Sequence, residues 1–215
     1  MKHMRGGPLS AGFTLIELLA VIVIIGILAA VLVSQFGSVE TAAKIETTRQ
    51  KLAMLDATLE AYNNEFGTYP ASHFSSEQEV VNDGHNIGAE ALVVALWSNG
   101  YEAGGLLEGL EDDLVNTDGD ASSKRITDFD LRSLLEIPDA WENPIAYIRA
   151  DDYEVTNRRY TVISLETGEE LVSIPVAFKN RTTGRFYSNR SYQLISAGLD
   201  GEFGTEDDLT TFNRN

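Results

Sequence analysis

The sequence contains no cysteine among its 215 residues, which excludes disulfide bonds, thiol chemistry and cysteine zinc sites. Histidine is scarce as well, with only His3, His73 and His85. No metalloprotease helix, nucleophile elbow, phosphate-binding glycine loop or dinucleotide fingerprint is present. We therefore expect the chain not to be an enzyme.

Basic residues are few: 16 Lys and Arg stand against 33 Asp and Glu, for a net charge of −17. The imbalance lies in residues 67–215, which hold 27 acidic and 11 basic residues. Such a body repels nucleic acid phosphates and anionic lipid headgroups, and it favours divalent cations. We expect no nucleic-acid partner.

Polar residues are absent from 18–33, the larger part of an apolar segment that covers 13–33. Its 21 residues are long enough to cross about 30 Å of hydrocarbon as a helix. The preceding residues 1–12 carry Lys2 and Arg5, which predicts a cytoplasmic N-terminus and an exported body. Glu17 lies inside this apolar segment, where a carboxylate costs roughly 2.5–3.5 kcal/mol on insertion scales, so it needs a function.

Two ordinary interpretations of this segment are a secretory signal peptide, cut near the "ILAA" of 27–30, and a simple single-pass anchor. Neither explains Glu17, and neither explains the Gly12-Phe13 step directly before the apolar run.

The stretch "GFTLIELLAVIVIIGILAA" resembles the class III signal of type IV pilins and pseudopilins. The resemblance implies that a prepilin peptidase cleaves between Gly12 and Phe13, removes the leader 1–12, and N-methylates Phe13. It also places the family's assembly glutamate, at the fifth mature position, on Glu17. A carboxylate paired with the methylated amine of a neighbouring subunit relieves two unpaired charges and can set the register between subunits.

A single long helix is predicted from Thr14 to Phe66, 53 residues or roughly 80 Å. Its first part, 13–33, is the predicted transmembrane segment, and 34–66 is amphipathic. Gly67 and Pro70 predict its end. The apolar residues of the second part recur at steps of 3 and 4, which predicts a stripe packed on the head domain: Leu52, Leu55, Leu59, Tyr62 and Phe66.

The head, 67–215, has an α+β pattern, with the long helix packed on a small antiparallel sheet as in pilins. Two short helices are predicted, at 89–100 and 127–138, the latter started by Thr127 or Asp128 and stopped by Pro138. The predicted strands are 145–150, 160–165, 171–178 and 191–197. The segment "PDAWENPIAY" resembles a pseudopilin segment in which glycine is common where this chain has Glu142, and Trp141 is predicted to be in the core.

An acid-rich segment covers 196–212, with five carboxylates between Asp200 and Asp208 and glycines at 201 and 204. One interpretation is a solvated acidic tail. The other is a calcium site, since calcium takes six to eight oxygen ligands in irregular loops. Residues 196–201 resemble the start of the calcium loop of the type II secretion major pseudopilin. That resemblance implies the following ligands: Asp200 and Asp207, with Asp208 beside them, and the backbone carbonyls of Ala197 and Glu202.

A second acidic segment, 111–120, places Asp118 and Asp120 at the spacing of an EF-hand start. The sixth position of that template falls on Ala121, where glycine is required, and the twelfth falls on Thr127, where glutamate is required. A turn is the expected structure.

These observations favour a pseudopilin of a type II secretion system, the family whose major subunit the sequence most resembles. Such a subunit is expected in the bacterial inner membrane with its head in the periplasm. Its expected partners are copies of itself, minor pseudopilins, the inner-membrane assembly platform and the prepilin peptidase. A type IV pilin for adhesion or motility is the alternative within the superfamily. A membrane-tethered periplasmic binding protein is the alternative from another class.

Overall fold

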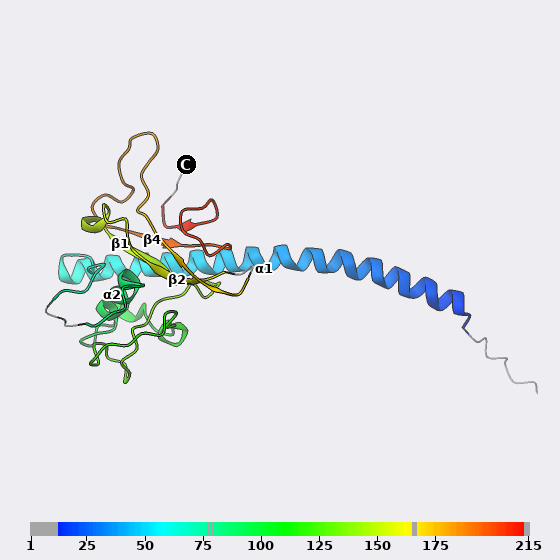
Figure 1. The fold of residues 1–215 in the computed structure, drawn as a ribbon, viewed down its shortest axis with the longest axis horizontal. Coiled ribbons are helices and arrows are strands. Elements are labelled where there is room, and N and C mark those ends of the chain that lie inside the picture. Colours follow the sequence, from blue (N-terminus) through cyan, green and yellow to red (C-terminus); the bar gives the residue numbers. More distant parts are fainter. Residues whose placement is uncertain (1–12, 77, 79, 165–166, 213–215) are drawn as a thin grey trace, which may run out of the picture. The chain divides into compact units, whose positions relative to one another are not determined.

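The structure is a computed structural model that describes residues 13–76, 78, 80–164 and 167–212, with the backbone alone described over 31–38. The chain divides into two compact units, Met1–Ala42 and Ala43–Asn215. The second unit contains the C-terminal part of the long helix and the whole head (Figure 1).

The long helix α1 runs from Leu15 to Phe66 and is 52 residues long, which confirms the predicted helix to within one residue. It ends because Gly67 adopts a positive φ of 72°, a conformation that glycine takes without steric penalty. The amide of Gly67 donates to the carbonyl of Asn63 at 2.8 Å and closes the last turn.

The predicted apolar stripe of α1 forms one side of the main core. Leu52, Leu55 and Leu59 are 2% exposed or less. Further along, Tyr62 is only partly buried and Phe66 is 50% exposed. The stripe therefore packs on the head over its first three positions and reaches the surface at its end.

Five strands form two antiparallel sheets. The first has the order β1-β4-β5, and the second pairs β2 with β3. Their bounds are β1 Ala146–Arg149, β2 Tyr160–Ile163, β3 Glu170–Ser173, β4 Tyr192–Ser196 and β5 Leu209–Thr210. The α+β class is confirmed, but the single expected sheet is two sheets, β3 ends five residues before the predicted 178, and β5 was not predicted.

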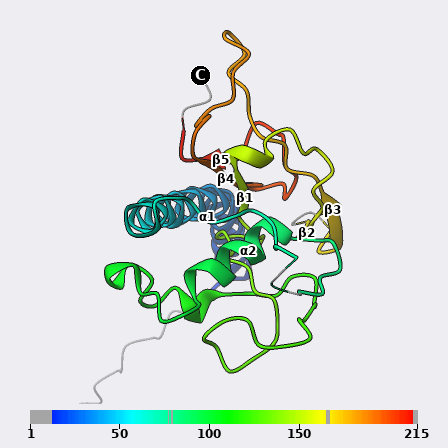
Figure 2. The ribbon, with the colours of Figure 1, turned by 90° about the vertical axis from the view of Figure 1, so that its left-hand side faces the viewer.

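The first sheet has two apolar faces because side chains alternate along a strand. Tyr147 and Leu194 share a cluster with the α1 leucines, whereas Ile148 and Ile195 share one with Tyr160 of β2. Figure 2 looks along α1 and shows β1 and β4 beside the helix, with β2 and β3 farther out. The sheet is thus the middle layer of the head.

Helix α2, Ile87–Leu96, begins two residues before the predicted helix 89–100 and ends four residues before its predicted end. Its inward residues Leu92, Val93 and Leu96 are at most 1% exposed, and the following Trp97 is 8% exposed, as expected. Three short 3₁₀ turns complete the helical elements of the described residues: η1 Ala103–Gly105, η2 Glu111–Asp113 and η3 Ala150–Asp152.

The helix predicted over 127–138 is wrong. This segment is an irregular chain whose backbone groups pair with 114–122. Val115 and Glu136 exchange two backbone hydrogen bonds, at 3.0 and 2.8 Å, and Ser122 donates to the carbonyl of Arg132 at 2.9 Å. The spacing of the leucines in this segment resembled that of a helix, but these long-range pairs take the backbone donors and acceptors that a helix would use.

Trp141 is buried at 4% exposure, as predicted, in a turn that puts Glu142 at a φ of +69°. Left-handed backbone costs a residue with a Cβ about 1–2 kcal/mol, which explains why glycine is common here in the family that the segment resembles.

We expect Glu142→Gly to raise the stability of the head by up to about 1 kcal/mol, because it removes this backbone strain. Urea unfolding of the full chain in a mild detergent, followed by the fluorescence of the buried Trp97 and Trp141, measures the effect. Glu142→Ala is the matched control, since alanine removes the same side chain but keeps the Cβ. An equal gain from alanine would contradict the backbone explanation.

Candidate functional site

The predicted processing site lies at the beginning of the described chain. Gly12 is outside the described residues, and Phe13 is 79% exposed directly before α1. A peptidase that cleaves before Phe13 would therefore leave a new terminus two residues from the helix.

Glu17 forms a capping box with Thr14. The backbone amide and the hydroxyl of Thr14 both donate to Glu17 Oε2, at 2.9 and 2.7 Å. In return the amide of Glu17 donates to Thr14 Oγ1 at 3.3 Å. This reciprocal pattern satisfies backbone donors that the first turn of a helix leaves free. The sequence signal for this cap is the Thr-x-x-Glu spacing of Thr14 and Glu17, which was not among the predictions.

The first unit presents apolar side chains all round the helix. Every large apolar residue from Leu15 to Leu28 is between 45% and 81% exposed. No helix in the described part of the chain is long and apolar enough to cross a membrane. The predicted span 13–33 extends into 31–33, whose side chains lie outside that part.

The predicted calcium loop connects two paired strands, since β4 and β5 are matched at Ser196↔Leu209 and Ile195↔Thr210. Within it the loop folds around Asp207. Thr205 Oγ1 donates to Asp207 Oδ1 at 2.6 Å, and the amide of Asp200 donates to Asp207 Oδ2 at 3.0 Å. Burial alone would raise the pKa of Asp207, but these hydrogen bonds outweigh it and lower the pKa. Asp207 is thus held as a carboxylate.

Gly198 makes this arrangement possible. Its φ is +66°, and a Cβ on it would lie 2.4 Å from the carbonyl oxygen of Asp207. The structure therefore brings the backbone amide of Asp200 to the carboxylate of Asp207, two of the predicted ligand residues, and it places the buried Ala197 directly before Gly198.

Asp208 faces another way. It is 4% exposed and accepts a hydrogen bond from the amide of Gly204 at 2.8 Å. Glu202 is exposed, and its carbonyl oxygen lies 3.3 Å from Thr205 Oγ1, whose one hydroxyl proton is directed to Asp207. The carboxylates and carbonyls of this loop are of the kind that calcium prefers, but its acidic side chains are not gathered at one point.

Asp139 links the loop to the rest of the head. Its Oδ1 accepts the amides of Trp141 and Asn143, at 2.8 and 3.1 Å, and its Oδ2 accepts the hydroxyl of Ser196 at 2.7 Å. Burial raises the pKa of Asp139 to about 6 even though these donors act to lower it. One buried carboxyl thus joins the turn at 138–143 to the end of β4.

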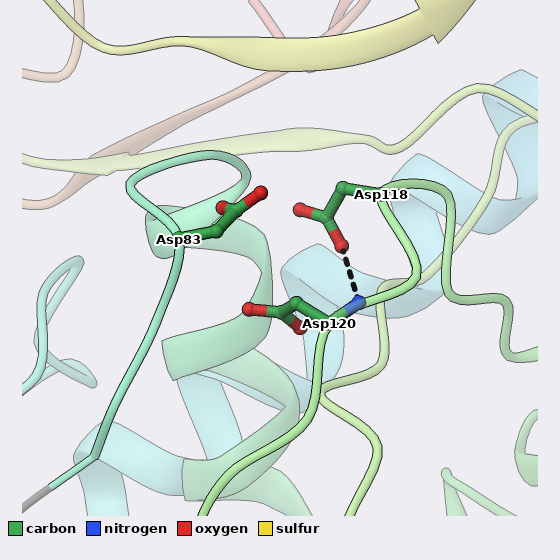
Figure 3. A group of neighbouring side chains, drawn as sticks. All are labelled: Asp83, Asp118 and Asp120. Atoms are coloured by element: carbon green, nitrogen blue, oxygen red, sulfur yellow. Dashed lines mark hydrogen bonds between the residues drawn. The ribbon is translucent and has the colours of Figure 1, made fainter.

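The second acidic segment has a structure that local spacing did not predict. Asp118 and Asp120 lie beside Asp83, from the loop before α2, with the carboxylates of Asp83 and Asp118 pointing toward each other (Figure 3). Glu90 of α2 and Glu136 also lie against Asp118. Asp83, Glu90 and Glu136 were not singled out in the sequence.

Within the described residues, three-carboxyl groups whose ligand atoms lie within 4.8 Å of one another occur at two places, Asp83-Asp118-Asp120 and Glu90-Asp118-Glu136. Neither includes the 196–212 loop.

Residues 8–33 match the family model described as the prokaryotic N-terminal methylation motif. The match indicates a type IV pilin-like N-terminal segment, in agreement with the resemblance of "GFTLIELLAVIVIIGILAA". No curated protein and no solved structure gives a significant match to the chain.

The raised pKa of Asp139 predicts a pH dependence of folding. Between about pH 4, the unfolded value, and about pH 6, the folded state binds more protons at this group, so its contribution to the free energy of unfolding falls as pH rises. Asp139→Asn removes this dependence, so the stability of the variant relative to the parent should increase across that window, by an amount on the order of 2 kcal/mol.

Urea unfolding from pH 4 to 7 measures the difference. The exposed Asp130→Asn is the control and should give a difference that is flat with pH. If the difference in stability between Asp139→Asn and the parent did not change with pH, the raised pKa of Asp139 would be contradicted.

Proposed function

We propose that this chain is a structural subunit of a type II secretion pseudopilus, which polymerises through its N-terminal helix and drives protein export across the outer membrane. The observation that carries the proposal is the methylation motif at 8–33, which runs into an uninterrupted helix that leads to the head. The proposed role is mechanical and involves no catalysis.

In this proposal a prepilin peptidase cleaves between Gly12 and Phe13 and methylates Phe13. The segment 13–33 then spans the bacterial inner membrane once, with the N-terminus in the cytoplasm and the head in the periplasm. The exposed apolar side chains between Leu15 and Leu28 support this, because a helix that is apolar all round is stable in lipid or within a helix bundle.

The assembled form would bring the helices of several copies together. The partners are other copies of this chain, minor pseudopilins and the inner-membrane assembly platform. Glu17 would exchange its contact with Thr14 for the methylated amine of Phe13 in a neighbouring copy, since an ion pair is favoured over two separate charges among packed helices.

We further propose that calcium binds in the 196–212 loop, through Asp200 and Asp207 with Asp208 beside them, and through the carbonyls of Ala197 and Glu202. The position of Asp207 supports this, because its carboxylate already joins both halves of the loop. An ion there would tie β5 and the C-terminus to β4 in a chain without disulfides.

Glu17→Gln tests the assembly role. Glutamine also serves in a capping box, so this change keeps the start of α1 and removes the charge. We expect the variant to insert in the membrane and to be cleaved after Gly12, but to give few fibres and to fail to restore secretion in a strain without the parent gene. Cleavage by mass spectrometry, fibre yield and secreted protein are the measurements.

Thr14→Ala is the matched control, since it disrupts the cap and keeps the carboxylate. It should lose about 1 kcal/mol of helix stability and still assemble. Normal fibres from Glu17→Gln would contradict the assembly role. If loss of the parent gene abolished surface fibres and left secretion intact, the subunit would belong to a type IV pilus.

Asp207→Asn tests the calcium loop. In the parent, chelation of calcium should loosen the C-terminal loop and increase its cleavage after Glu202 and Glu206 by a glutamate-specific protease. In Asp207→Asn the C-terminus should be cleaved rapidly with or without calcium, while Asp200→Glu keeps a carboxylate and should retain part of the protection. Equal protection of the parent in calcium and in chelator would contradict the site.

A further inference from the structure

Two groups of three carboxyl groups share Asp118 and together draw on four separate segments of the head. Asp83 precedes α2, Glu90 lies in its first turn, Asp118 and Asp120 lie in the following loop, and Glu136 lies in the extended segment before β1. Asp118 is common to both three-carboxyl groups, the first of which is shown in Figure 3. We call these five residues the head carboxyl cluster.

The buried side of the cluster contains an acidic side chain with an oxygen that nothing satisfies. Glu90 is 0% exposed, its Oε2 accepts from Asn82, and its Oε1 has no hydrogen-bond partner among the described residues. A buried oxygen of this kind is unfavourable unless a ligand occupies the space before it.

The same is true of the residues across from it. Both carboxylate oxygens of Asp120 are inaccessible and lack a donor within the described part, as does Oδ2 of Asp118. The other oxygen of Asp118 accepts only a long hydrogen bond, 3.4 Å, from the amide of Asp120. Four oxygen atoms from three side chains therefore lack a partner within the described residues, and they are distributed over the two groups that share Asp118.

Few basic side chains lie near the carboxyl groups of the cluster. The described residues include one ion pair with the cluster, in which His85 Nδ1 lies 3.9 Å from Asp83 Oδ2. No ion pair with lysine or arginine is found for Glu90, Asp118, Asp120 or Glu136 within the described residues. Burial, with the neighbouring carboxyl groups, raises the pKa of Glu90 to about 10 and that of Glu136 to about 8. A bound cation would reverse this, since it stabilises the charged form.

The cluster is held by a fixed framework. Asn86, at a left-handed φ of 48°, donates to Thr117 Oγ1 at 2.8 Å and to Glu136 Oε1 at 2.9 Å, and accepts the amide of Thr161 at 2.9 Å. Asn116 shapes the 116–120 turn, accepting the amide of Gly119 and donating to the carbonyl of Asp120, both at 2.7 Å. The segments that carry the carboxyl groups are thus tied to one another and to β2.

We propose that the head carboxyl cluster binds one hard divalent cation, calcium, in addition to any ion in the 196–212 loop. The donors are oxygen atoms alone, which suits calcium, magnesium and manganese and disfavours softer metals. Calcium fits best, because it accepts many carboxylates in irregular geometry, whereas magnesium requires near-ideal octahedral positions. The ion joins the loop before α2, the 114–121 loop and the segment before β1, none of which has a regular strand or helix of its own at these residues.

The test uses the full chain in detergent with Asp207→Asn as background, so that the C-terminal loop does not contribute. Calorimetric titration of the metal-free protein with calcium chloride should show one ion bound per chain. Adding Glu90→Gln and Asp120→Asn should weaken the affinity at least tenfold. Adding Asp112→Asn, an exposed acid of the same segment, should leave it unchanged.

Urea unfolding provides a second measurement, in which the stability of the double variant relative to the background should change sign between chelator and calcium. In chelator, Glu90→Gln with Asp120→Asn should unfold at a higher urea concentration than the background, because the fold no longer has to bury two carboxyl groups that are charged in the unfolded chain at neutral pH. In calcium the order should reverse, because the ion is lost. Asp83→Asn changes a partly exposed side chain, so it should weaken calcium binding while the chain still folds. This variant tests the site even if the double variant fails to fold.

Failure of the background chain to bind calcium, magnesium or manganese would overturn the proposal, as would undiminished binding by the double variant. Binding of one ion by both the parent and the Asp207→Asn chain would support the head carboxyl cluster and would contradict the calcium loop. Two ions in the parent and one in Asp207→Asn would support both sites.

Discussion

The head depends on burial of one face of α1. Leu52, Leu55 and Leu59 supply an apolar stripe that α2 covers on one side and β1 and β4 on the other. Full burial of each leucine contributes about 1.5–3 kcal/mol. Polar contacts fix where the head lies along the stripe: Thr48 Oγ1 accepts the amide of Ala140 at 3.0 Å, and Asp56 Oδ1 accepts the hydroxyl of Tyr192 at 2.7 Å. Apolar area holds the layers together, and these hydrogen bonds set their register.

The buried acidic residues of the head differ in whether the protein supplies hydrogen-bond donors to their carboxyl oxygens. Asp139 accepts hydrogen bonds from two amides of its own turn and from the hydroxyl of Ser196, so donors of the protein satisfy both of its carboxylate oxygens. Glu90 and Asp120 also have carboxyl oxygens that solvent does not reach, but these oxygens have no hydrogen-bond partner within the described residues, and other acidic side chains lie nearby. Since donors surround Asp139 but not Glu90 and Asp120, a bound cation is the partner that we propose for the head carboxyl cluster.

The sequence predicted what repeats along the chain. The steps of 3 and 4 in α1 and the short apolar runs of β1, β2 and β4 reflect burial of those segments, and these elements were found. The segment 127–138 failed because Leu134 and Ile137 are buried in an extended chain, where Glu136 also turns inward. β5 was missed because its two residues pair with β4 only after the acidic loop has folded. The head carboxyl cluster joins residues from Asp83 to Glu136, so no template of local spacing could find it.

In the proposed assembly, Glu17 has two partners in turn, Thr14 in the single chain and an amine in the polymer. In the single chain it accepts two donors of Thr14, an arrangement worth about 1 kcal/mol. In the proposed polymer it would face an amine in a medium of low dielectric, where an unpaired charge is several kcal/mol less favourable than a paired one. The cap is therefore weak enough to exchange, and it keeps the helix start ordered until a partner arrives. A residue that only closed the capping box could equally be glutamine, whereas a carboxylate is needed where a cation is the proposed final partner.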